Sequence, residues 1–192
     1  MRLFVAAEVP RPVLADLQER VQRLIGSLPE ARWTGEATRH ITLKFLGPTE
    51  PERLPEVQRR CTAVAAAGSP CDLRIEGLGA FPRPGRATVL WAGVGDSAGM
   101  LGRLAGGLDA AFSTMGYRAE ARPFAAHVTL ARFRRPARLG LPDLEPLEPF
   151  LLRGIHLYRS HLSAAGARYE PLAAFRLGEI HGVREEVGGA GG

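Results

Sequence analysis

Two copies of one tetrapeptide, His40-Ile-Thr-Leu43 and His127-Val-Thr-Leu130, hold the side chains of this sequence that are best suited to chemistry. They lie 87 residues apart in a chain with five histidines, which indicates an internal duplication. Residues i and i+2 of a β-strand point to the same face. Each histidine therefore projects together with the threonine two positions later, while Ile41 and Val128 face a core.

Two imidazoles and two hydroxyls that meet in one cleft suit phosphoryl transfer without a metal. Because an ordinary histidine has a pKa of about 6.5, one ring can act as base and the other as acid at neutral pH. Thr42, Thr129 and a nearby arginine can hold the charge on the oxygens of a phosphate. Rings of His40 and His127 on either side of phosphorus would promote an in-line displacement.

Two other interpretations of the repeated motif stay open. A histidine in a strand is often only structural, although two histidines with the same neighbours are poorly explained in that way. The pair could also bind zinc, but a catalytic zinc site needs a third protein ligand, often Glu or Asp, at a signature spacing. Neither motif has an acidic residue nearby on the same face. We therefore predict a site with no metal and no cofactor.

The overall composition is that of an ordinary globular protein, with 192 residues, 45% of them hydrophobic and 23% charged. No apolar run is long enough to cross a membrane, and Glu8 interrupts the apolar N-terminal stretch, so we predict a cytoplasmic protein. Cys61 and Cys71 are expected to be free thiols. The net charge is +5, and residues 121–142 contain five arginines and no acid. That stretch is either a solvated basic face or a phosphate-binding patch.

Hydrophobic periodicity predicts the elements that position the motifs. Strands are predicted over residues 2–8, 40–46, 72–78, 88–94 and 125–133, helices over 10–25, 51–67 and 100–115, and a hairpin from 150–162 and 169–177. Such a mixture of strands and helices with hairpins favours an α+β fold over a doubly wound parallel sheet. Each motif lies in a strand of its own half of the chain, so two similar lobes are expected.

Longer segments around the motifs resemble a known family. His40-Ile-Thr-Leu-Lys-Phe-Leu-Gly47 and His127-Val-Thr-Leu-Ala-Arg132 are similar to the twin motifs of the two-histidine phosphoesterases, above all the RNA 2′,3′-cyclic phosphodiesterases, also named 2′-5′ RNA ligases. The family's middle segment and closing hairpin resemble 79–83 with 89–93, and 157–160 with 166–169. The departures are Arg39, where the family often has an apolar residue, and Ala126, where it often has proline.

This resemblance implies an α+β fold of two pseudo-symmetric lobes, each an antiparallel sheet with outer helices, with the active-site cleft between them. The bilobal domain is expected over residues 1–177, followed by a flexible Gly-rich tail over 178–192. We expect a monomer that acts on RNA ends or cyclic nucleotides, and tRNA halves are substrates that some family members join. The predicted reaction is hydrolysis of an RNA 2′,3′-cyclic phosphate to a 2′-phosphate.

The resemblance also assigns roles to residues. His40 and His127 are the expected catalytic residues, and Thr42, Thr129 and Arg132 are expected to bind the phosphate. The two motifs are too alike for the sequence to distinguish acid from base, and our own assignment is His127 as base and His40 as acid. Two alternatives are 2′-5′ ligation of tRNA halves as the main activity, and an RNA-binding module that has lost catalysis. A silent module would be expected to have a broken motif, and both motifs are intact here.

Strict alternation from His127 would place Arg132 on the far face of its strand. For Arg132 to reach the phosphate, the strand must end or bulge after Leu130, as the resemblance implies.

The same alternation puts Lys44 on the His40 face, either at the cleft rim or as a solvated strand-end residue, and puts Phe45 in the core. Further candidates to stack on a base are Trp33, Phe81 and Tyr158. The remaining histidines, interpreted as structural or surface residues, are His156, His161 and His181.

Overall fold

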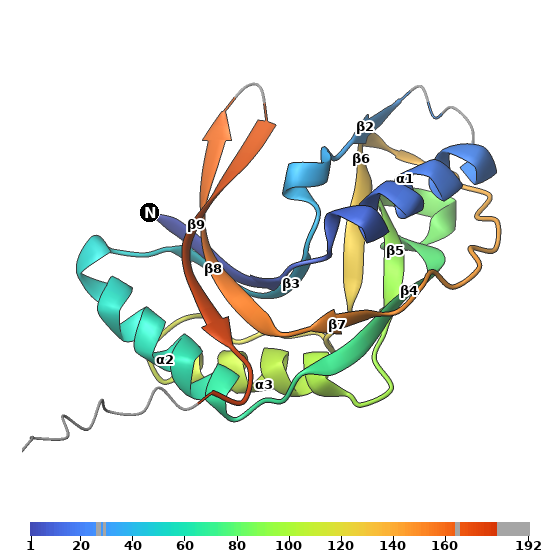
Figure 1. The fold of residues 1–192 in the computed structure, drawn as a ribbon. Helices are drawn as coiled ribbons and strands as arrows, with labels where there is room; N and C mark the ends of the chain where they lie inside the picture. The colour runs from blue at the N-terminus through green and yellow to red at the C-terminus, as the bar shows by residue number, and fades with distance from the viewer. Residues whose placement is uncertain (26–27, 29, 164–165, 180–192) are drawn as a thin grey trace, which may run out of the picture.

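The computed structural model describes residues 1–25, 28, 30–163 and 166–179 (Figure 1). The strands are β1 (Arg2–Ala7), β2 (Ala31–Trp33), β3 (Ile41–Pro48), β4 (Cys71–Phe81), β5 (Ala87–Gly95), β6 (His127–Ala137), β7 (Phe150–Leu152), β8 (Gly154–Ser163) and β9 (Gly166–Arg176). The α-helices are α1 (Arg11–Ile25), α2 (Leu54–Ala66) and α3 (Met100–Ser113). Short 3₁₀ turns are η1 (Glu36–Thr38), η2 (Pro51–Arg53) and η3 (Pro84–Arg86).

All described strands belong to one curled sheet in the order β7-β4-β5-β6-β3-β1-β8-β9, with β2 paired to β6. Every pairing in it is antiparallel, which confirms the predicted α+β class. The curl gives the ribbon a U shape, with the β8–β9 hairpin in one arm and β2 and β6 in the other (Figure 1). The two halves of the sheet are joined where β3 pairs with β6, at Ile41 and Val128.

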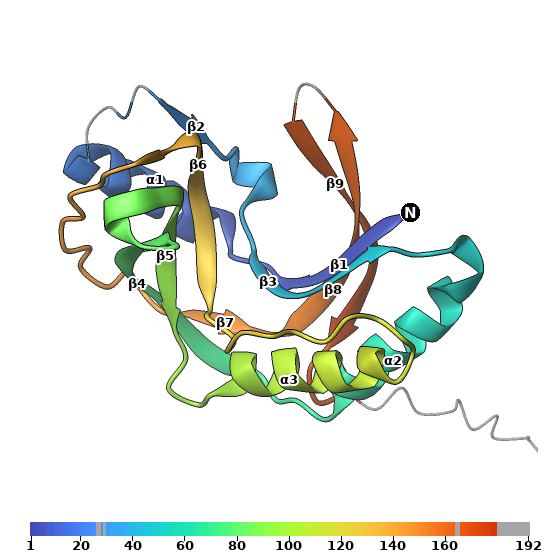
Figure 2. The same cartoon turned by 180° about the vertical axis from the view of Figure 1, so that it is seen from behind.

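Helices cover the outer side of the U. Helices α2 and α3 pack against each other and against the half that contains β3, β8 and β9, and α1 lies along the half that contains β4, β5 and β6 (Figures 1 and 2). Each helix buries an apolar stripe with helical spacing, such as Leu14, Leu17 and Val21 of α1. None of the described helices is both long and apolar enough to span a membrane.

The structure differs from the sequence predictions in two elements. The strand predicted over 150–162 is interrupted at Arg153, because β7 pairs with β4 while β8 pairs with β1. The short strand β2 was not predicted. Cys61 and Cys71 are buried free thiols, as expected. Gly178 and Glu179 follow β9, and residues 180–192 of the predicted tail lie outside the described residues.

Candidate active site

The two motifs meet where β3 and β6 pair. The partners Ile41 and Val128 are the residues directly after the two motif histidines. Continuing that antiparallel register by one residue sets His40 opposite Thr129, and Thr42 opposite His127. All four side chains line one cavity of about 260 Å³. The structure therefore brings the two predicted His–Thr pairs together in one place.

A β-bulge follows the threonine in both motifs. Between Val5–Lys44 and Ala6–Thr42 the register of β1 and β3 skips Leu43. Leu130 is skipped in the same way between the β5 and β6 partners. Because the extra residue reverses the alternation, the residue after each bulge is buried and the next one faces the cavity.

The bulges decide where the fifth residue after each histidine points. Arg132 lies after the bulge at Leu130, as the resemblance implied, and its side chain lines the cavity. Phe45 occupies the equivalent position in the first motif. Its prediction as a core residue is wrong, because the bulge turns it outward to 61% exposure, where it also lines the cavity.

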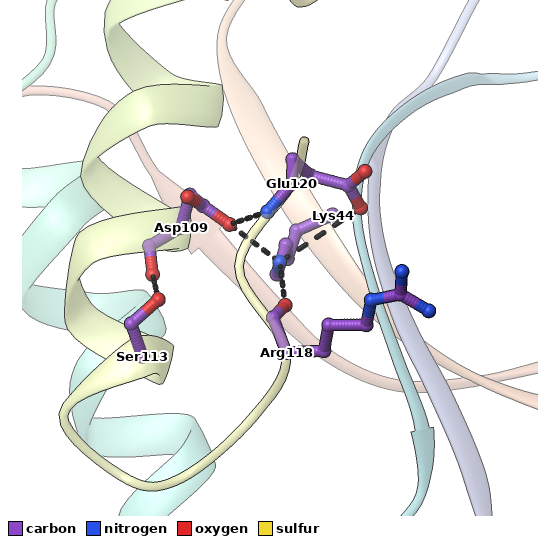
Figure 3. A network of polar contacts seen from close by, with 5 residues as sticks. All are labelled: Lys44, Asp109, Ser113, Arg118 and Glu120. Atoms are coloured by element: carbon purple, nitrogen blue, oxygen red, sulfur yellow. Dashed lines mark hydrogen bonds and ion pairs between the residues drawn. The ribbon is translucent and has the colours of Figure 1, made fainter. Parts of the chain in front are cut away.

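The same bulge corrects both interpretations of Lys44, which lies neither at the cleft rim nor in solvent. Its side chain is fully buried on the outer side of β3. The ammonium group is 2.5 Å from the Asp109 carboxylate of α3 and donates to the carbonyl of Arg118 at 2.7 Å. Glu120 lies 3.8 Å away (Figure 3). Lys44 therefore ties the first motif strand to the segment that leads into the second.

Backbone contacts fix the orientation of both histidine rings. Nδ1 of His127 lies 2.7 Å from the carbonyl oxygen of Ala125 and donates to it, so Nε2 carries the lone pair when the ring is neutral. His40 is hydrogen-bonded to the backbone of Thr38, the equivalent position in its motif. Nε2 of His40 lies 3.0 Å from Oγ1 of Thr42. Each ring therefore has one nitrogen held by the residue two positions earlier.

Both histidines are desolvated, and this lowers their pKa values. Burial lowers the pKa of His40 to about 4 and also lowers the pKa of His127. Aromatic rings supply the apolar surroundings: Phe4 stacks on His40 at 4.9 Å, and Phe81 meets His127 edge-on at 5.0 Å. The positive charge of Arg132 lowers both pKa values further, so it acts on both rings.

Some of the aromatic and histidine candidates line cavities at the site, and others lie away from it. Trp33 lines the cavity. Tyr158 donates to the Glu8 carboxylate and lines a second cavity, of about 400 Å³, which His40 also lines. Away from the site, His161 lies 2.7 Å from a carboxylate oxygen of Glu170. His156 lies 3.7 Å from Glu8, and His181 lies outside the described residues.

Sequence reasoning missed the residues that hold the second bulge in place. Oγ1 of Thr34 donates to the carbonyl oxygens of Thr129 at 2.8 Å and Leu130 at 2.9 Å. The buried Arg39 donates to Thr34 through Nε at 3.3 Å, and to Gln18. In the sequence, Arg39 stands out only as a departure from the family pattern. Thr34 follows β2, and that strand of three residues is too short to show a periodicity that would mark it.

Potential metal ligands do not gather in this part of the molecule. Within residues 1–25, 28, 30–163 and 166–179, no group of three or more His, Cys, Asp or Glu side chains is arranged so that it could hold a metal ion.

A curled antiparallel sheet that brings two His-x-Thr motifs into one cavity defines a two-histidine phosphoesterase. The chain matches the family model described as LigT like Phosphoesterase over residues 6–91 and 94–169, and it belongs to that family. The solved structure of TT0787 from Thermus thermophilus has a TM-score of 0.80 and 32% identity, and the match covers 94% of this chain and all of that one.

Several relatives carry the name RNA 2′,3′-cyclic phosphodiesterase, among them one from Thermus thermophilus and one from Geobacillus stearothermophilus. The one from Thermus thermophilus is 34% identical over 200 residues, covering all of this chain and 97% of the relative. The one from Geobacillus stearothermophilus is 32% identical over 177 residues, covering 86% of this chain. The chain spans 55% of the length of the Geobacillus relative.

Proposed function

We propose that this protein hydrolyses the 2′,3′-cyclic phosphate at RNA ends to a 2′-phosphate, without a metal. The observation that carries the proposal is the convergence of two His–Thr pairs and one arginine in a single cavity. The names of the Thermus and Geobacillus relatives support the same substrate. A cytoplasmic monomer remains our expectation for the state of the protein.

In the proposed reaction, water attacks phosphorus on the side opposite the 3′ oxygen. A bond forms between the water oxygen and phosphorus, the bond from phosphorus to the 3′ oxygen breaks, and the phosphate stays on the 2′ oxygen. One histidine takes the proton of the water, and the other gives a proton to the 3′ oxygen. Thr42, Thr129 and Arg132 donate hydrogen bonds to the non-bridging oxygens, where negative charge grows.

We propose His127 as the base and His40 as the acid. With a pKa of about 4, His40 is neutral at pH 7 before substrate binds. An anionic phosphate beside the ring favours its protonated form and so raises that pKa. The opposite assignment, with His40 as base, gives the same dependence of rate on pH, because the pair titrates together. A substrate with a different leaving group distinguishes the two assignments of acid and base.

The leaving-group experiment uses a cyclic phosphate in which sulfur replaces the 3′ oxygen. A thiolate leaves readily without a proton, so loss of the acid should matter little with this substrate. We expect His40→Ala to regain most of the wild-type rate on the sulfur analogue and His127→Ala to remain slow. The reverse result would exchange the two roles.

The function itself is tested with an oligonucleotide that ends in a 2′,3′-cyclic phosphate. The wild-type protein should yield a 2′-phosphate, identified by its resistance to an enzyme that removes only 3′-phosphates. His40→Ala and His127→Ala should each lose about 10²–10⁴ in rate, the usual range for an acid or base. The double variant should be little slower than either, because the pair acts as a unit. An unchanged cyclic end, a 3′-phosphate, or mainly 2′-5′ joined product would contradict the proposal.

A further inference from the structure

A second arginine lies beside Arg132 at the edge of the cavity. Strand β2 pairs with β6 so that Arg32 is the direct partner of Arg132. Both side chains are exposed and both line the cavity that holds the motif histidines. Thr34 binds the carbonyl oxygens at the bulge of β6, which fixes β2 against that strand. The position of Arg32 is therefore set by the same contacts that set Arg132.

Two like charges directly opposite each other across a strand pair destabilise a sheet. Arginines elsewhere in the molecule have acidic partners, as Arg59 and Arg60 of α2 do in Glu56. Neither Arg32 nor Arg132 forms an ion pair with any described residue. The two cations thus leave a concentration of positive charge that an anionic ligand would neutralise.

Arg32 also reaches across the opening of the cavity. Its Nη2 atom lies 3.8 Å from the point where a Cβ on Gly166 would be, and Gly166 begins β9 in the opposite arm of the sheet. Arg132, and not Arg32, is among the charges that lower the pKa values of the two histidines. Arg132 therefore acts on the two histidines, whereas the guanidinium of Arg32 lies beside Gly166 at the start of β9.

We propose that Arg32 binds the phosphate of the nucleotide that precedes the cyclic end, and so makes the enzyme prefer an RNA chain over a cyclic mononucleotide. This inference rests on the function proposed above and names the part of the substrate that Arg32 recognises. A cyclic mononucleotide has one phosphate, which His40, His127 and Arg132 already surround. Only a longer chain offers a second phosphate to the guanidinium of Arg32.

The experiment compares a nucleoside 2′,3′-cyclic phosphate with a dinucleotide that ends in the same cyclic phosphate. A hydrogen bond to a charged group contributes enough affinity for about a 10- to 100-fold effect. Arg32→Gln should therefore raise KM for the dinucleotide about 10- to 100-fold and change kcat little. The preference for dinucleotide over mononucleotide, measured as the ratio of kcat/KM values, should fall by the same factor.

Two other variants provide the controls. Arg132→Gln should damage turnover of both substrates, because Arg132 serves the cyclic phosphate. Arg103→Gln removes an exposed arginine from α3, on the outer side of the sheet, and should leave the ratio unchanged. The salt dependence of dinucleotide binding should lose about one unit of log–log slope in Arg32→Gln, as one phosphate contact is lost.

The outcomes separate this inference from the proposed function. If the wild-type protein hydrolyses neither substrate, the proposed function fails. If it hydrolyses both with equal kcat/KM, or if Arg32→Gln slows both substrates equally, the function stands and the second phosphate site is wrong. Arg32→Lys keeps the charge and should retain part of the preference for the dinucleotide. A purely structural role of Arg32 would instead lower the free energy of unfolding and slow both substrates equally.

Discussion

Lys44 is the only lysine of the chain, and its buried ammonium group connects β3, α3 and the segment before β6. Replacing it with methionine keeps an unbranched side chain of similar length in the same space. The change removes the cation and leaves the Asp109 carboxylate without its main partner. We expect Lys44→Met to fold, but with a clearly lower free energy of unfolding.

The exposure of the partners sets the size of the effect. Removing one member of a fully buried pair costs about 3–5 kcal/mol, because the other charge stays buried and unpaired. Asp109 is 27% exposed and also accepts from the Glu120 amide at 3.0 Å, so water and that amide compensate part of the loss. We expect Lys44→Met to cost about 2–3 kcal/mol. That corresponds to about 4–12 °C in Tm for a chain of this size.

Asp109→Asn should cost more, about 3–5 kcal/mol, because the cation has no solvent exposure and keeps only the Arg118 carbonyl and the more distant Glu120 carboxylate as partners. The double variant should be more stable than the sum of the two losses predicts, by about 0.5–3 kcal/mol of coupling. The measurement is urea denaturation followed by circular dichroism.

A surface ion pair supplies the matched control. Arg23→Met breaks a pair with Glu19 whose side chains are 66% and 70% exposed, and it should change stability by less than about 0.5 kcal/mol. Because the Lys44 side chain is fully buried, an amine-reactive reagent should modify it only when the protein unfolds. Modification of a lysine can be assigned to Lys44 because the chain has no other. A Lys44→Met variant as stable as the Arg23→Met variant would refute this account of the network.

Three further predictions concern catalysis. Dialysis against EDTA should leave turnover of a cyclic phosphate unchanged, and a loss that zinc restores would contradict the metal-free reaction. Since the base must be neutral and the acid protonated, and burial lowers the pKa of both histidines, kcat/KM should fall on the acid side near pH 4 and on the basic side below pH 6.5. The limbs of kcat should lie at higher pH, because the bound phosphate raises both pKa values; a basic limb of kcat/KM well above 6.5 would argue against desolvated rings. Arg132→Ala should reduce kcat for cyclic mononucleotide and RNA alike, and normal turnover of the mononucleotide would show that Arg132 does not contact the reacting phosphate.

The repeated motif predicted much of the site from the sequence. Alternation along a strand was sufficient to place each histidine with its threonine, because this stretch before the bulge has regular β geometry. The antiparallel α+β class also followed from the pattern of strands and helices. The bulge at Leu130 was expected through the resemblance, and the repeat carried the signal for its counterpart at Leu43. Extending the bulge to the first copy would have placed Phe45 in the cavity.

Other features depend on tertiary contacts that local sequence does not show. Strand β2 has three residues, and it exists because Thr34 and its neighbours bond to the bulged part of β6. The interruption at Arg153 arises because two different strands accept the residues on either side of it. Lys44 looks like a solvated lysine until its partner Asp109, which is 65 residues away, is known. In each case the decisive partner is distant in the chain.

The two bulges also show where the symmetry of the duplicated site ends. Both motifs supply a histidine, a threonine and a bulged leucine at equivalent positions around the Ile41–Val128 pair. A phosphate bound between the motifs would therefore meet the same groups from either side. The fifth position is different, because one motif presents the guanidinium of Arg132 and the other the exposed ring of Phe45. Under the proposed function, charge on one wall and an apolar ring on the other would give a bound phosphate a direction, and that direction would let two similar histidines take different roles.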